Sequence, residues 1–109
     1  MRMPKYLVQG SYSVDGHKGL LKQGGSARRE AIGKLMESVG GRLETLYFAF
    51  GADDFIIIGD LPDNVSASAV ALNAAASGAV SNVRTTVLLT PDEVDQVAKK
   101  SVVYKPPTP

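Results

Sequence analysis

The sequence predicts a small α+β domain whose elements follow the order β-α-β-β-α-β-α. Two short apolar segments flank Gly51–Asp53 and are typical of a β-hairpin. Segments with helical spacing of apolar residues lie on both sides of that hairpin. Thr90-Pro91-Asp92-Glu93 combines an N-cap, a proline at the first helical position and a capping-box glutamate. With 109 residues, 44% apolar and 21% charged, the chain has the size and composition of one globular domain.

The first half of the chain predicts a strand, a loop and a helix. Lys5–Ser13 alternates in the manner of a strand, with Tyr6, Val8 and Tyr12 on one face. Val14–Gly25 contains four glycines and no sustained period, so we expect a long loop. Ser26–Val39 has one apolar stripe at three-and-four spacing, which predicts a helix capped by Ser26 and ended by Gly40 or Gly41.

The second half predicts the hairpin and two more helices. The expected elements are strands Arg42–Phe50 and Asp54–Asp60, helix Val65–Ala79 capped by Asp63 or Asn64, strand Asn82–Leu89, and a last helix from Pro91 to about Lys100 with Val94, Val97 and Ala98 facing inward. Residues 5–100 therefore form the predicted single domain. Residues 101–109 form a proline-rich tail whose Val102, Val103 and Tyr104 are apolar enough to dock on a neighbour.

The first six elements match the ferredoxin-like βαββαβ arrangement, or α/β plait, with the last helix as an addition. In that arrangement both helices cover one face of the sheet. The hairpin strands nevertheless carry apolar residues on both faces, for example Ile56 and Ile58 against Phe55 and Ile57. An uncovered apolar sheet face favours association with a second copy, so we expect a homodimer of the dimeric α+β barrel type.

Composition argues against several classes of function. The net charge is +1, which gives no field for nucleic acid or for an anionic membrane. The absence of cysteine excludes thiol nucleophiles and cysteine-ligated metals. Because no motif for a cofactor or metal is found, none is expected. The start, MRMPKYLV, has no apolar core of a signal peptide and no run is long enough to span a bilayer, so a cytoplasmic protein is expected.

The runs GGRLETLYFAFGADDFIIIGDLPDN, VRTTVLLTPDEVD and KKSVVYKPP resemble the GYD domain family of small bacterial proteins, and the resemblance extends from Met3 to the proline tail. It implies a ferredoxin-like fold and a dimer, and it implies no catalytic residue. In the Gly-Tyr-Asp signature at the hairpin turn, Gly51 and Asp54 match and Asp53 stands where the family has an aromatic residue. Ser26 and Arg29 match the Ser-x-x-Arg start of the family's first helix.

Two stretches suggest polar chemistry. His17, the only histidine, lies in the expected loop, where it is either a general acid–base group or single metal ligand, or a solvated side chain. Gly24–Arg29 leads into a helix N-terminus, where free N–H groups and two arginines either hold an anion or form an ordinary capped helix. Asp53 and Asp54 are adjacent residues whose side chains point to opposite faces of a strand, so they are not expected to share one proton or one metal ion.

The leading functional hypothesis is a dimeric protein that binds a small organic molecule between sheet and helices. Its candidate ligand-binding residues are Tyr12, His17, Arg29, Tyr47 and Asp54: the tyrosines lie beside small residues and would frame a pocket, His17 would close it, and Arg29 would pair with an anionic group. One alternative is a cofactor-independent oxygenase or isomerase with His17 as base. The other is a structural or interaction module whose apolar sheet face is its whole function.

Overall fold

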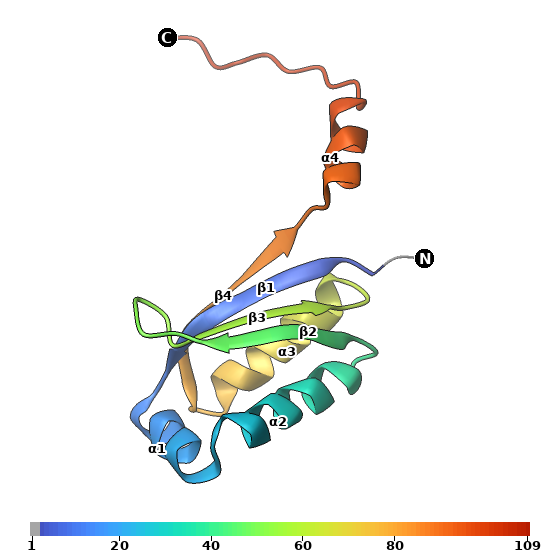
Figure 1. Cartoon of the computed structure of the whole chain (residues 1–109). Coiled ribbons are helices and arrows are strands. Elements are labelled where there is room, and N and C mark those ends of the chain that lie inside the picture. Colours follow the sequence, from blue (N-terminus) through green and yellow to red (C-terminus); the bar gives the residue numbers. More distant parts are fainter. Residues whose placement is uncertain (1–2) are drawn as a thin grey trace.

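In the computed structural model, which describes residues 3–109, four strands form one antiparallel sheet in the order β2-β3-β1-β4 (Figure 1). The elements are β1 (Lys5–Tyr12), α1 (Val14–Gln23), α2 (Gly25–Glu37), β2 (Arg42–Phe48), β3 (Phe55–Asp60), α3 (Asn64–Ala76), β4 (Val80–Leu88) and α4 (Pro91–Ala98). Helices α2 and α3 lie on the same face of the sheet. The predicted ferredoxin-like α+β fold is confirmed.

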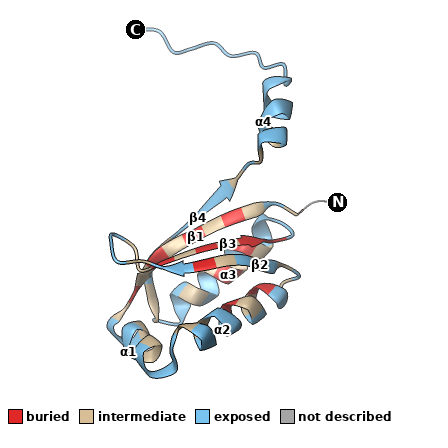
Figure 2. Ribbon diagram, viewed as in Figure 1, coloured by how far each residue is buried: buried red, intermediate tan, exposed pale blue. Residues whose placement is uncertain are grey.

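The hydrophobic core lies between that face of the sheet and the two helices (Figure 2). The strict alternation of β1 places Tyr6, Val8 and Tyr12 in it, while α2 contributes Ile32 and Met36. Gly59 of β3 leaves the space that the Met36 side chain occupies, because a Cβ at Gly59 would lie 2.5 Å from the Met36 sulfur. Met36 is accordingly only 1% exposed and is among the most buried large side chains.

The predicted loop over Val14–Gly25 is wrong, because most of this segment is helix α1. The Ser13 hydroxyl caps it by accepting a hydrogen bond from the Gly16 amide at 3.1 Å. The Ser13 amide donates to the Ala79 carbonyl at 2.9 Å, which fixes the start of α1 against the start of β4. Capping and this tertiary contact outweigh the low helix propensity of glycine. Ser26 does not cap α2 as predicted: α1 ends at Gly24, from which α2 starts directly.

The predicted helix ends are otherwise close to those observed. Gly40 has a φ of 83°, the left-handed conformation expected after α2. The Asp63 carboxylate caps α3 by accepting from the Ser66 amide at 2.8 Å. Thr90 and Glu93 form the complete capping box of α4. The strands are shifted by one to two residues from their predicted bounds.

The last helix does not pack on the domain as its sequence predicted. Figures 1 and 2 show α4 and the tail extending away from the sheet, with no buried residue. Val94 and Val97, expected to face inward, are 50% and 57% exposed. The radius of gyration is 16.8 Å, whereas a compact domain of this length has about 13 Å. The apolar stripe of α4 therefore has no partner within residues 3–109.

None of the helices within residues 3–109 covers the second sheet face, called here the open face. By strand register it carries Leu7, Tyr47, Ile56, Ile58 and Leu88. Four of these side chains are partly exposed, and Tyr47 is 67% exposed. The uncovered apolar sheet face predicted from the hairpin strands is thus present.

Candidate functional site

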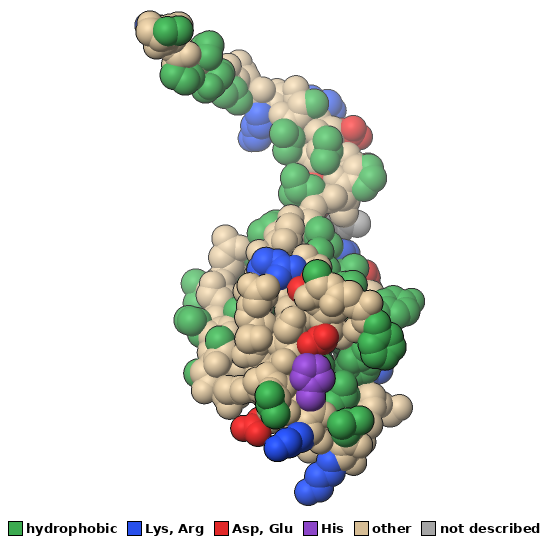
Figure 3. All heavy atoms as spheres, turned by 90° about the vertical axis from the view of Figure 1, so that its left-hand side faces the viewer, with side chains coloured by type: hydrophobic (Ala, Val, Ile, Leu, Met, Phe, Trp, Pro, Cys, Tyr) green, Lys and Arg blue, Asp and Glu red, His purple; other side chains and the backbone are tan. Residues whose placement is uncertain are grey.

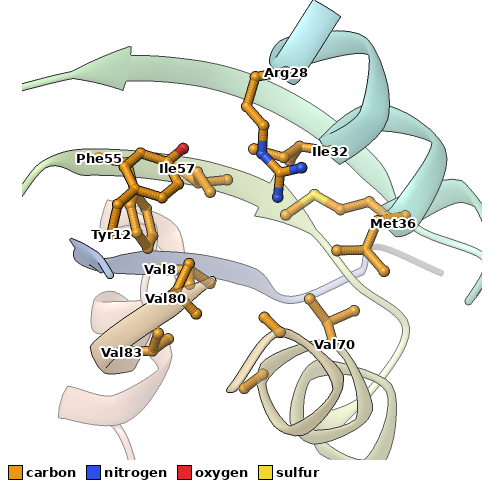
Figure 4. A pocket seen from close by; sticks show the side chains of 13 residues that line it. Val8, Tyr12, Arg28, Ile32, Met36, Phe55, Ile57, Val70, Val80 and Val83 are labelled. Atoms are coloured by element: carbon orange, nitrogen blue, oxygen red, sulfur yellow. The ribbon is translucent and has the colours of Figure 1, made fainter. Parts of the chain in front are cut away.

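A small cavity of about 50 Å³ lies between α2, α3 and the helix-covered face of the sheet (Figure 4). Most of its walls are aliphatic or aromatic. They are formed by Val8, Tyr12, Arg28, Ile32, Leu35, Met36, Phe55, Ile57, Val70, Ala71, Ala74, Val80 and Val83. The small side chains of Ala71 and Ala74 in α3 leave this space between the helix and the sheet unfilled.

Arg28 is the one charged residue in the wall of this cavity. It comes from the first turn of α2, and Figure 4 shows its guanidinium directed into the space beside Ile32 and Met36. Its Nε is buried and has no hydrogen-bond partner. A buried N–H without a partner costs about 1–3 kcal/mol, so this donor is available to a bound acceptor.

Tyr12 forms another part of the wall, at the end of β1, beside Phe55 at a ring-centroid distance of 5.1 Å. Burial raises the pKa of its hydroxyl, whereas the positive charge of Arg28 and a hydrogen bond from the Arg28 side chain lower it, and Asp54 adds to the rise. A tyrosine hydroxyl is protonated at neutral pH, so it can donate a hydrogen bond. Tyr12 and Arg28 thus bring two donors to an otherwise apolar cavity.

Asp54 and His17 lie together next to Tyr12, but they are not part of the cavity wall. The Asp54 carboxylate accepts from the Tyr12 amide at 2.9 Å and lies 3.4 Å from His17 Nε2. His17 Nδ1 lies 3.0 Å from the Ser13 carbonyl oxygen. The imidazole side chain is 53% exposed (purple in Figure 3). Its ring centroid lies 5.9 Å from that of Tyr12, and the two rings are arranged edge to face. The structure therefore groups Tyr12, His17 and Asp54.

Arg29 and Tyr47 lie elsewhere. Arg29 is exposed on the outer side of α2, in a surface groove with Ser26 and Glu30. Tyr47 belongs to the open face of the sheet, on the side opposite the cavity. Neither residue lines the space that contains Tyr12.

The sequence contains a signal that Arg28 faces the interior. Arg28, Ile32, Leu35 and Met36 occupy positions i, i+4, i+7 and i+8, which share one face of a helix. A charged residue in the register of an apolar stripe is directed toward the interior. Arg29 is one residue further on and therefore points about 100° away from it.

A second polar cluster lies at one end of the open face, in a groove that also includes Thr90 and Glu93. Lys5 Nζ lies 2.8 Å from Asp60 and 2.5 Å from Glu44, and Arg42 lies 3.2 Å from Asp60. The hydrogen bond from Lys5 is the main cause that lowers the pKa of Asp60. Since these charges are already paired, the groove presents no free group comparable to the Arg28 Nε.

Within residues 3–109, no three histidine or carboxylate side chains gather closely enough to hold a metal ion. Over the same residues, none of the helices is both long and apolar enough to cross a bilayer.

The model of the GYD domain matches residues 6–98, which is most of the chain, and the protein belongs to this family. No curated protein matches in sequence. Among solved structures, that of MtbAldR has a TM-score of 0.59 at 17% identity and matches 80% of this chain, which spans about half of MtbAldR (52%). The NE2512 protein of unknown function from Nitrosomonas europaea has a TM-score of 0.44 at 19% identity, with 83% and 92% of the two chains matched. At these identities the first likeness establishes the fold alone.

Proposed function

We propose that the protein binds a small organic molecule in the cavity between α2, α3 and the sheet, and that it acts as a homodimer. The observation that carries the binding proposal is the buried, unpartnered Nε of Arg28 in a cavity with apolar walls. Ligand sites combine apolar walls with a few convergent polar groups in this way. The Tyr12 hydroxyl supplies the second such group.

This choice is favoured over the two alternatives by where the side chains lie. A cofactor-independent oxygenase or isomerase needs a base in the cavity, and His17 is not among the lining side chains. A purely structural module needs no cavity, whereas one is present in the core. A binding protein uses the features observed without requiring a further catalytic group.

The homodimer is supported by the open face and by α4. An apolar sheet face built from Leu7, Tyr47, Ile56, Ile58 and Leu88 costs free energy if it stays in water. A two-fold axis through this face would bury the same residues of both copies. The extended α4 and tail carry further exposed apolar side chains, including Val102, Val103 and Tyr104, which a partner subunit would cover.

Native mass spectrometry of protein purified gently from its own source tests the binding proposal. We expect a discrete mass above that of the polypeptide. Ala74→Leu, which fills the cavity, should abolish this mass, and Ala75→Leu at an exposed position of the same helix should retain it. Protein without added mass, or an added mass unaffected by Ala74→Leu, would contradict the proposal.

Light scattering coupled to gel filtration tests the homodimer. The unmodified chain should have twice its 11.5 kDa mass. Ile56→Lys on the open face should give a folded monomer, because burying an unpaired charge in an interface is costly. Leu72→Lys, on an exposed position of α3, is the matched control and should remain dimeric. A monomeric unmodified protein would refute this part of the proposal.

A further inference from the structure

We infer that the cavity binds a short aliphatic monocarboxylate, with its carboxylate group on Arg28 and its hydrocarbon part among the apolar walls. This inference rests on the proposed binding function and specifies the chemical class of the ligand. It is carried by the charge, the donors and the size of the cavity, which are considered in turn.

The cavity wall contains one permanent positive charge and no negative one. Asp and Glu are absent from the lining residues, and none of the ion pairs formed within residues 3–109 includes Arg28. The residue as a whole is partly exposed, but its Nε is buried, and an N–H that is removed from water is stabilised by a hydrogen-bond acceptor. An anionic ligand would supply that acceptor together with a counter-charge.

The donors suit a singly charged, planar anion. The guanidinium presents its N–H groups in a fork that matches the two oxygens of a carboxylate. The protonated hydroxyl of Tyr12 is a further donor to the same group. A phosphate dianion would bring a second negative charge into apolar surroundings that hold no second cation, so a carboxylate fits better than a phosphate.

The walls and the volume define the remainder of the ligand. Away from Arg28 and Tyr12, the lining is aliphatic or aromatic, including Val70, Val80 and Val83, so the body of the ligand should be hydrocarbon (Figure 4). The volume is about 50 Å³. An apolar cavity of about 150 Å³ accommodates the six carbons of benzene, so one third of that volume indicates a ligand of about two or three carbons, with the carboxylate carbon included.

Isothermal titration calorimetry of the full chain tests this inference with the sodium salts of acetate, propionate, butyrate and octanoate. Propionamide and inorganic phosphate are the probes that lack the negative charge or the hydrocarbon part. We expect propionate to bind at least about tenfold more tightly than propionamide, which corresponds to the contribution of one charge-assisted hydrogen bond. Octanoate should bind more weakly than propionate, because it exceeds the cavity, and phosphate should not bind.

Two neighbouring arginines give a matched pair of variants. Arg28→Gln should abolish the preference for propionate over propionamide, whereas Arg29→Gln removes the same charge outside the cavity and should leave both affinities unchanged. If circular dichroism shows that Arg28→Gln does not fold, Arg28→Lys keeps the charge but loses the fork of N–H groups, and should weaken the binding of propionate but not of propionamide.

The results separate this inference from the proposed function. If propionamide binds as tightly as propionate and Ala74→Leu abolishes the binding of both, the cavity is a ligand site but the carboxylate inference is wrong. Phosphate binding that depends on Arg28 would also overturn it, as would failure of every carboxylate in the series to bind. Ligand binding that persists in Ala74→Leu would remove the cavity itself as the site.

Discussion

Replacing Gly16 of α1 with alanine should destabilise the protein, whereas the same replacement at Gly19 should stabilise it. Both glycines lie in α1, Gly16 in its first turn and Gly19 in its interior, and alanine is favoured over glycine in a helix by up to about 1 kcal/mol. They differ in what surrounds them. A Cβ at Gly19 would meet nothing within 4 Å, while a Cβ at Gly16 would lie 2.1 Å from the Ala79 carbonyl oxygen.

The magnitude at Gly16 follows from that contact. A carbon and a carbonyl oxygen approach to about 3.3 Å, so α1 would have to move by roughly 1 Å from the start of β4. Such overpacking costs about 1–3 kcal/mol, and loss of the hydrogen bond from the Ser13 amide to Ala79 adds about 1 kcal/mol. After the helix-propensity gain of about 1 kcal/mol, the net loss is about 1–3 kcal/mol.

Thermal unfolding followed by circular dichroism is the assay. For a domain of this size we expect Gly19→Ala to raise Tm by about 4–8 °C and Gly16→Ala to lower it by about 5–20 °C. Equal stabilisation by the two replacements would show that α1 does not pack against Ala79. That result would refute the explanation given above for helix formation in this glycine-rich segment.

Three further replacements test other parts of the structure. Met36→Ala should lower the free energy of unfolding by about 2–5 kcal/mol in urea titrations, because the side chain is almost fully buried; a loss under 1 kcal/mol would place it outside the core. Asp60→Asn should cost about 1–3 kcal/mol at pH 7. Its folded-state pKa is lowered, so the ionised carboxylate stabilises the fold above pH 3.8 and this contribution disappears as the pH falls below that value. The Tm difference from the unmodified protein should therefore shrink in acid, and a constant difference would exclude the ionic interaction with Lys5. His17→Ala should leave the affinity for propionate unchanged and cost at most about 1 kcal/mol of stability, since the exposed imidazole lies outside the cavity; a large loss of affinity would show that His17 belongs to the site.

Local signals in the sequence were sufficient for most of the fold. The alternation in β1 and the periodicity of α2 predicted which residues are buried, and Asp63 and Thr90 predicted two helix starts. Each of these signals depends on neighbours within one turn or two strand positions. The same reasoning identified Tyr12 as an inward-facing tyrosine.

The sequence-based predictions differ from the structure where contacts between residues far apart in the chain determine the local structure. Helix α1 depends on the contact between Ser13 and Ala79, which glycine-rich composition does not reveal. The stripe of α4 indicates an apolar face but not whether the same chain covers it. The Ser-x-x-Arg start of α2 favoured Arg29 as the ligand-binding arginine. The register of the apolar stripe indicates instead that Arg28 faces the interior.

The position of β1 in the sheet has a consequence for how the chain folds during synthesis. Of the four strands of the sheet, β1 is synthesised before its partners, and it is an inner strand that pairs with β3 and then with β4, where Lys5 lies opposite Asp60 and Leu88. Both of its hydrogen-bonding edges therefore wait for partners that are made much later, which closes large loops and slows folding. Until Leu88 has been synthesised, one edge of β1 stays open to wrong pairing, so the nascent chain depends on protection that the finished sheet no longer needs.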